Sequence, residues 1–319
     1  MLLSPEVLAI LLLDIIFVVF SLVAFILSVK IFLQWDIKAT TKLQYTLEKQ
    51  SFLTATIIKY IFALKLPLFL FFIFTLDKIS GVLTGAMCAA GVVNATNYGV
   101  YLFILKILNI YVFGFWLVLH YLDIKKETLP YTKIKFGFFS VIFFLFIAEI
   151  IVEFLMFNSL NPNKMVSCCG TLYSSASSSS YISSIFEINR SVLLILFYGS
   201  FVGMIFSYLF SHKYIFSFLN LFFIIISIIS LIIFFGTYIY ELPTHHCPFC
   251  FLQKDYYYIG YLLYILLFLG TFYGLLVGFI SDNKQRDKKY ILSLIFNAAY
   301  IIVVSSYVVI YYMKNGVLL

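Results

Sequence analysis

Long runs of apolar residues separated by short polar segments dominate the pattern of this chain. Eight runs have the length, about 20 residues, that an α-helix needs to cross the hydrocarbon core of a bilayer. They cover approximately residues 8–33, 53–76, 98–121, 138–157, 191–210, 215–238, 257–280 and 291–312. The strict apolar–polar alternation of barrel strands is absent from the sequence. The pattern therefore predicts an all-α fold, a polytopic membrane helical bundle with about eight transmembrane helices.

The composition supports this prediction and narrows the classes of protein. Hydrophobic residues make up 63% of the 319 residues and charged residues 11%, so one water-soluble core could not bury the apolar surface. The longest polar segment, around residues 158–190, contains a serine-rich tract of low complexity and no soluble domain. We therefore predict a single integral membrane domain over residues 1–319. The sequence holds no nucleotide-binding loop, dinucleotide fingerprint, haem-attachment motif or His-Glu-x-x-His helix.

The distribution of Lys and Arg predicts the orientation of the chain. The segments after the first, third, fifth and seventh runs hold twelve of these residues, and the opposite segments hold five. Because basic loop residues accumulate on the cytoplasmic side, both termini are expected outside the cytoplasm. The net charge of +7 is then mainly an orientation signal, and we expect the lipid bilayer and no nucleic acid as a partner. A multi-pass plasma membrane protein, specifically of a bacterial inner membrane, fits this arrangement.

All five cysteines fall in segments assigned to the extracytoplasmic side: Cys88, Cys168, Cys169, Cys247 and Cys250. Cys247 and Cys250 form a Cys-x-x-Cys motif, in which two sulfurs can close a small disulfide ring and one thiolate can be stabilised. Cys168 and Cys169 are adjacent, and a disulfide between neighbours strains the backbone, so each is expected to have another partner. We treat all five as candidate catalytic thiols, and the alternative is a set of disulfides that only brace the loops.

Soft-metal binding is a second chemistry that these segments offer. His245 and His246 directly precede Cys247, and Met87 directly precedes Cys88. A protonated imidazole lowers the pKa of a nearby thiol, whereas a neutral imidazole joins thiolates as a ligand of zinc or copper. The thioether of methionine suits Cu(I). Copper or zinc held by the cysteines with His245, His246 and Met87 is therefore the alternative to redox chemistry, although the spacings match no zinc-finger or zinc-ribbon pattern.

The segment 247–258, Cys-Pro-Phe-Cys-Phe-Leu-Gln-Lys-Asp-Tyr-Tyr-Tyr, resembles a segment of two known families. It is similar to the Cys-x-x-Cys entry to a helix in the bacterial disulfide-bond-forming quinone reductases and in the vitamin K epoxide reductase family. The resemblance implies that Cys247 and Cys250 form a pair beside a quinone cofactor. It further implies that Cys168 and Cys169 stand for shuttle cysteines that exchange electrons with a periplasmic thiol protein. Members of both families have fewer spans than the eight expected here.

Ionisable residues within the apolar runs predict a buried ion pair. Lys106 and Glu149 each lie eight residues from the outer end of their run, at a depth of about 12 Å for a helical rise of 1.5 Å per residue. Glu153 lies one turn from Glu149 on the same face and is expected nearer the water. The pair could carry protons for redox chemistry or only fix the helix register. Asp14 in the first run and Lys59 in the second are further polar sites to which the sequence assigns no partner, and Lys65 lies near the middle of the second run, two residues before Pro67.

These observations lead to three hypotheses of function. The first is a membrane thiol:disulfide redox protein that exchanges electrons between extracytoplasmic thiols and a lipid quinone, which would make it a thiol:quinone oxidoreductase. The second is a membrane protein that binds or transports copper or another soft metal. The third is a structural membrane subunit of a larger complex, whose disulfides brace its outer face.

Overall fold

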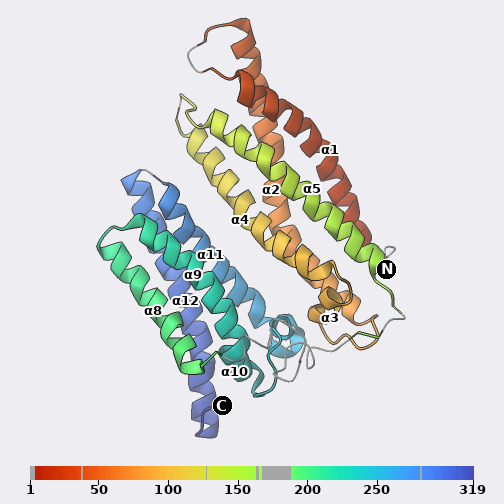
Figure 1. Cartoon of the computed structure of the whole chain (residues 1–319), viewed down its shortest axis with the longest axis vertical. Coiled ribbons are helices and arrows are strands. Elements are labelled where there is room, and N and C mark those ends of the chain that lie inside the picture. Colours follow the sequence, from red (N-terminus) through yellow and green to blue (C-terminus); the bar gives the residue numbers. More distant parts are fainter. Residues whose placement is uncertain (1–3, 37–38, 127, 163–164, 167–187, 281) are drawn as a thin grey trace. The chain divides into compact units, whose positions relative to one another are not determined.

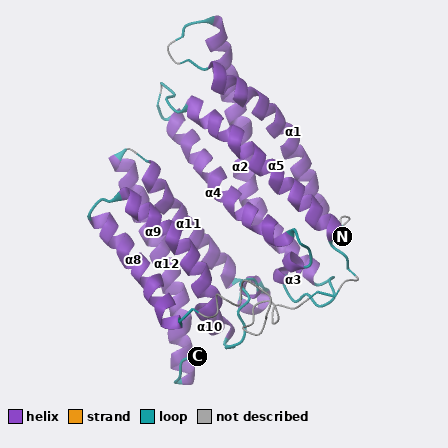
Figure 2. Ribbon diagram, viewed as in Figure 1, coloured by secondary structure: helices purple, strands orange, loops and turns teal. Residues whose placement is uncertain are grey.

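A computed structural model describes residues 4–36, 39–126, 128–162, 165–166, 188–280 and 282–319. Within these ranges eight helical spans are long and apolar enough to cross a membrane, and each overlaps one of the eight predicted runs. These helices and the absence of strands from the described residues confirm the all-α polytopic bundle (Figure 2). The spans are α1 (Pro5–Gln34), α2 (Lys42–Ser80), α4 (Gly99–Ile124), α5 (Thr132–Ser159), α8 (Arg190–Leu209), Lys213–Tyr240, α11 (Ile259–Phe279) and α12 (Asn283–Asn315) (Figure 1).

The chain divides into two compact units with four membrane-spanning helices each. The first unit comprises Met1–Thr84 and Val92–Val166, and the second comprises Gly85–Gly91 and Ser167–Leu319. The seven residues 85–91 therefore belong to the second unit although both flanking segments belong to the first. A single membrane domain over the whole chain stays a prediction, because the division describes each unit by itself.

The first unit is a ring of four helices around an aromatic core. Helix α1 contacts α2 and α5, and α4 contacts the same two helices. Phe62 of α2 stacks on Phe113 of α4 with ring centroids 4.3 Å apart, and its edge meets Trp116. The indole Nε1 of Trp116 donates a hydrogen bond to the backbone oxygen of Lys135 at 3.0 Å. The opposite faces of these helices expose large apolar side chains, as expected where lipid covers them.

A buried carboxylate joins the end of α4 to the start of α5. Asp123 accepts hydrogen bonds from the backbone nitrogen of Tyr131 at 2.8 Å, from Thr132 Oγ1 at 2.9 Å and from Lys135 Nζ at 2.6 Å. Both charged side chains are buried. Lys135 is one of the twelve basic residues assigned above to cytoplasmic segments, and the structure places it in the first turn of α5, paired with Asp123.

The second unit is built around close contacts of α11 with α9 (Lys213–Ser230) and α12. Gly274 of α11 lies so close to the amide of Asn220 that a Cβ at this position would collide with it. Asn297 Nδ2 donates to Asn220 Oδ1 at 3.0 Å, and Ser293 Oγ donates to the backbone oxygen of Gly270 at 2.7 Å. Small residues and internally paired polar groups are a common way to pack helices in lipid, where burial of apolar surface does not drive association.

The sixth span is compound, whereas the sequence predicts one continuous helix. Helix α9 leads into a π-helical segment, Leu231–Phe235, and then into α10 (Gly236–Tyr240). In the π-helical segment the backbone N–H of Gly236 donates to the oxygen of Leu231, five residues earlier. A Cβ at Gly236 would lie 2.6 Å from that oxygen, which explains the glycine. Helix α10 ends at Tyr240, and Glu241 turns the chain with a left-handed φ of 54°.

Candidate functional site: a cluster of three cysteines

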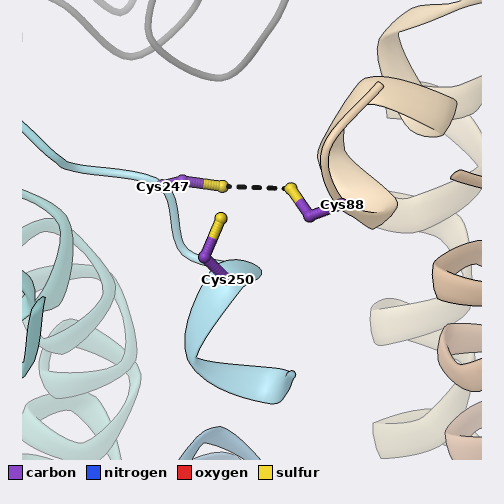
Figure 3. Close-up of side chains that lie close together, drawn as sticks. All are labelled: Cys88, Cys247 and Cys250. Carbon is purple, nitrogen blue, oxygen red and sulfur yellow. Dashed lines mark hydrogen bonds between the residues drawn. The ribbon is translucent and has the colours of Figure 1, made fainter. Parts of the chain in front are cut away.

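Three of the five cysteines lie together in the second unit. Cys88 belongs to the segment Gly85–Gly91 and directly precedes the short helix α3 (Ala89–Asn94). Cys247 and Cys250 lie in the loop between α10 and α11, and Cys250 begins the 3-10 turn Cys250–Leu252. The sulfur atoms of Cys88 and Cys247 point toward each other across a 3.6 Å contact, with Cys250 beside Cys247 (Figure 3). All three sulfurs lie within 4.8 Å of one another.

The three thiols are enclosed by protein. Cys88 is 0% exposed, Cys247 1% and Cys250 6%. The 3.6 Å between the sulfurs of Cys88 and Cys247 is longer than the about 2.05 Å of an S–S bond, so no covalent bond joins these two atoms. Cys247 is therefore close to two possible partners, one from its own Cys-x-x-Cys motif and one from a segment 159 residues earlier in the chain.

Tyrosines from the flanking helices hold the Cys-Pro-Phe-Cys loop. The hydroxyl of Tyr240, the last residue of α10, donates to the backbone oxygen of Cys247 and accepts from the backbone nitrogen of Phe251 at 3.1 Å. Tyr264 of α11 donates its hydroxyl hydrogen to the backbone oxygen of Pro248 at 2.7 Å. Buried tyrosines commonly use their hydroxyl in this way. Together these bonds fix the backbone on which both sulfurs of the motif are mounted.

Close packing and one cross-segment hydrogen bond complete the support of the site. A Cβ at Gly260, near the start of α11, would collide with the ring of Phe251 and lie 2.8 Å from Leu252. This glycine lets the 3-10 turn that begins at Cys250 lie directly on the helix. Gln253 Nε2 donates to the backbone oxygen of Met87 at 3.0 Å, which ties the Cys88 segment to the Cys-x-x-Cys loop.

Burial favours the neutral form of the two histidines that precede Cys247. Burial lowers the pKa of His245, with Cys88 acting in the opposite direction and His246 in the same direction. Burial also lowers the pKa of His246, whose Nδ1 donates to the backbone oxygen of Ile232 at 2.9 Å. The ring of His245 packs edge-on against Tyr240. Because both imidazoles are neutral near pH 7, neither supplies the positive charge that would stabilise a thiolate.

The described group of sulfur atoms contains neither histidine, and the role of His245, His246 and Met87 as metal ligands stays a prediction. Among the described His, Cys, Asp and Glu residues, the group with ligand atoms within 4.8 Å of one another contains the sulfurs of Cys88, Cys247 and Cys250 and neither histidine. The side chain of Met87 is 70% exposed. Cys168 and Cys169 lie outside the described residues, so their expected role as relay thiols stays a prediction.

The intramembrane charges form a larger group than the sequence indicates. In the first unit Lys106 Nζ lies 3.0 Å from Glu149 Oε1 and 2.7 Å from Glu153 Oε2. Glu153 is 0% exposed and therefore faces the interior of the first unit, and its depth relative to the water stays a prediction. Lys65 contacts Glu149 at 3.2 Å and Asp14 at 2.7 Å, two contacts absent from the sequence analysis. The available signal was the cost of a lone intramembrane charge, which requires a partner for each lysine.

No known protein family matches this chain, and no curated protein or solved structure shows significant similarity to it. A functional conclusion therefore depends on the geometry of the three-cysteine cluster and on the chemistry of its residues.

Proposed function

We propose that this protein is a membrane thiol:disulfide redox protein in which Cys247 and Cys250 are the reactive pair and Cys88 is a third, exchanging thiol. The observation that carries the proposal is the convergence of three buried sulfurs within 4.8 Å, including the 3.6 Å contact between Cys88 and Cys247. Thiol–disulfide exchange proceeds by attack of a thiolate on one sulfur of a disulfide, so a third thiol beside a Cys-x-x-Cys pair has a direct chemical use.

The reaction balances with a lipid quinone as the acceptor, the cofactor implied by the resemblance of segment 247–258. Forming the Cys247–Cys250 disulfide removes two electrons and two protons from the two thiols, and the quinone takes up both to become a quinol. The thiolate of Cys88 then attacks the sulfur of Cys247. A Cys88–Cys247 bond forms, the Cys247–Cys250 bond breaks, and Cys250 leaves as a thiolate that takes up a proton.

The burial of the cluster has a consequence for the electron donor. A folded thiol protein is much larger than a quinone and has poor access to sulfurs whose residues are at most 6% exposed, so the proposal includes an intermediate thiol. In this proposal Cys168 and Cys169 supply it, and a periplasmic thiol protein reduces them in turn. The proposal places these segments on the outer face of a bacterial inner membrane. The lipid bilayer as surroundings follows from the eight apolar helices.

The test uses the purified full-length chain in lipid nanodiscs. Alkylation followed by peptide mass mapping should show a Cys247–Cys250 disulfide that a thiol reductant opens and an added short-chain quinone restores. Cys250→Ser removes the thiol that would displace a partner from Cys247. A mixed disulfide of Cys247 with Cys88, Cys168 or Cys169 should therefore accumulate. Cys247→Ser is the matched control and should trap none of these through position 247. If quinone never oxidises the pair and Cys250→Ser traps nothing, the redox proposal fails and a structural subunit becomes the better interpretation.

Soft-metal binding is the second candidate, and the spacing of the sulfur atoms favours it. Thiolates that surround one ion at a bond length of about 2.3 Å lie about 3.8 to 4.0 Å from one another. The sulfurs here, 3.6 Å apart for Cys88 and Cys247 and all within 4.8 Å, are close to that spacing. A set of three thiolates fits Cu(I) better than structural zinc, which takes four ligands.

Metal analysis of the same preparation separates the two candidates. A copper site should bind about one Cu(I) per chain, lose it in Cys88→Ser and keep it in His245→Asn, because neither histidine belongs to the sulfur group. A redox pair should instead form its disulfide in metal-free protein.

A further inference from the structure

A chain of five alternating charges lies between the four spanning helices of the first unit. Asp14 of α1 contacts Lys65 of α2 at 2.7 Å, and Lys65 contacts Glu149 of α5 at 3.2 Å. Glu149 contacts Lys106 of α4 at 3.0 Å, and Lys106 contacts Glu153 of α5 at 2.7 Å. All five residues are at most 6% exposed. We refer to these residues as the charge chain.

The five ionisable groups of the charge chain do not sum to zero charge. Three carboxyl groups and two ammonium groups leave one negative charge in excess if every group is ionised. Each lysine contacts two carboxyl groups, which favours its cationic form. Lys106 Nζ also lies 4.5 Å from the ring centroid of Phe72, and Lys65 Nζ lies 5.1 Å from that of Phe146. An uncompensated buried charge costs several kcal/mol even after relaxation, and a membrane-spanning bundle offers little water to reduce that cost. One more positive charge is therefore required.

The hydrogen bonds indicate which carboxyl groups can take it. Glu149 Oε1 accepts from both lysines, and its Oε2 accepts from Asn109 Nδ2 at 2.6 Å, as expected of a carboxylate. Each end carboxyl group bonds through one oxygen only. The other two oxygens, Asp14 Oδ2 and Glu153 Oε1, are buried and have no hydrogen-bond partner among the described residues. A protonated carboxyl group carries its hydrogen on such an oxygen.

We propose that the charge chain is a proton-binding site that holds one exchangeable proton on an end carboxyl group, Asp14 or Glu153. Binding this proton makes the site neutral, and releasing it leaves one buried negative charge. A cavity of about 10 Å³, close to the space that one water molecule needs, lies beside Lys65, Lys106 and Glu149. The ligand of this site is a proton. Proton uptake by the first unit can in this way be coupled to another process in the membrane. The proposal involves residues of the first unit only and is independent of the cysteine chemistry.

Infrared spectroscopy counts protonated carboxyl groups directly, through their C=O stretch and its shift in D₂O. The full-length protein in nanodiscs at pH 7 should show one such group, and Glu153→Gln and Asp14→Asn should each show none. Lys106→Met should show two, because it removes one cation and leaves three carboxyl groups. Glu241→Gln is the control and should keep one, since Glu241 forms an exposed ion pair with Lys314 in the second unit.

Three outcomes would overturn the proposal. The wild-type protein could show no protonated carboxyl group at pH 7, Glu153→Gln and Asp14→Asn could both keep the band unchanged, or the band could disappear when choline chloride is replaced by sodium chloride. The last result would assign the missing positive charge to a sodium ion. The wild-type count needs no substitution, so the test does not depend on the folding of a variant, and circular dichroism checks the helix content of each variant.

Discussion

Replacing Asp123 with asparagine should destabilise the first unit strongly. The carboxylate accepts hydrogen bonds from Tyr131, Thr132 and Lys135, and the Lys135 side chain is buried. Asparagine keeps the shape but leaves the lysine as a lone buried cation, which commonly costs about 3 to 5 kcal/mol. This range corresponds to an unfolding constant raised by about two to three and a half orders of magnitude. A single interhelical hydrogen bond in a membrane protein has an average value of only about 0.6 kcal/mol.

The assay is reversible unfolding in mixed micelles with an increasing fraction of dodecyl sulfate, followed by tryptophan fluorescence. The double variant Asp123→Asn with Lys135→Met should be less destabilised than Asp123→Asn alone, because no buried cation is left. Lys133→Met, at an exposed position two residues away, should change the free energy of unfolding by no more than about 0.5 kcal/mol. The reasoning is refuted if the single change costs less than about 1 kcal/mol or if the two changes are additive.

Three further predictions concern the second unit and the topology. Gly260→Ala should displace the aromatic ring packed on it and destabilise the unit by about 1 to 3 kcal/mol, whereas Gly199→Ala, with nothing within 4 Å of the new Cβ, should be neutral or stabilising by urea or detergent unfolding. Burial lowers the pKa of His245, so the folded state binds less proton there; stability should be complete above the unfolded pKa of about 6.5 and fall as the pH drops below it. Thermal unfolding should show a smaller loss in His245→Asn and the wild-type loss in His212→Asn, an exposed position, and equal losses in both variants would contradict this assignment. In a cysteine-free background, a cysteine at Arg286 should react with an impermeant maleimide only in inverted vesicles, and labelling in intact cells would reverse the predicted orientation.

The spanning helices were predictable because lipid imposes a simple rule on sequence. About 20 apolar residues in a row are needed wherever a helix crosses, and each of the eight runs contains its helix core. The helix ends were less predictable. Helix α2 begins at Lys42, eleven residues before the predicted run, because the polar turns that extend it into water carry no apolar signal. The π-helical segment Leu231–Phe235 lies inside a uniformly apolar run, and its composition does not distinguish it from an α-helix.

The sequence predicted which residues belong to the cysteine site, but it did not predict which of them are in contact. The Cys-x-x-Cys motif identified Cys247 and Cys250 because their spacing is local. Their contact with Cys88 depends on a segment of seven residues that joins the second unit from a distant part of the sequence. Likewise, the depth of Lys106 and Glu149 predicted that they meet. The roles of Asp14 and Lys65 depend on how α1 and α2 pack, which residue depth alone does not specify.

The π-helical segment sets the direction in which the side chains of α10 point around the helix axis. One residue more per turn rotates the next turn by about 100° relative to an uninterrupted α-helix. His246 donates to the backbone oxygen of Ile232 within this wide turn. A residue of the cysteine loop therefore contacts the π-helical turn that sets the orientation of Tyr240. Tyr240 in turn binds the backbone on both sides of the Cys-x-x-Cys motif. The loop and the helix before it therefore support each other. If the wide turn relaxed to an α-helix, the hydroxyl of Tyr240 would move away from the backbone that carries the two sulfurs.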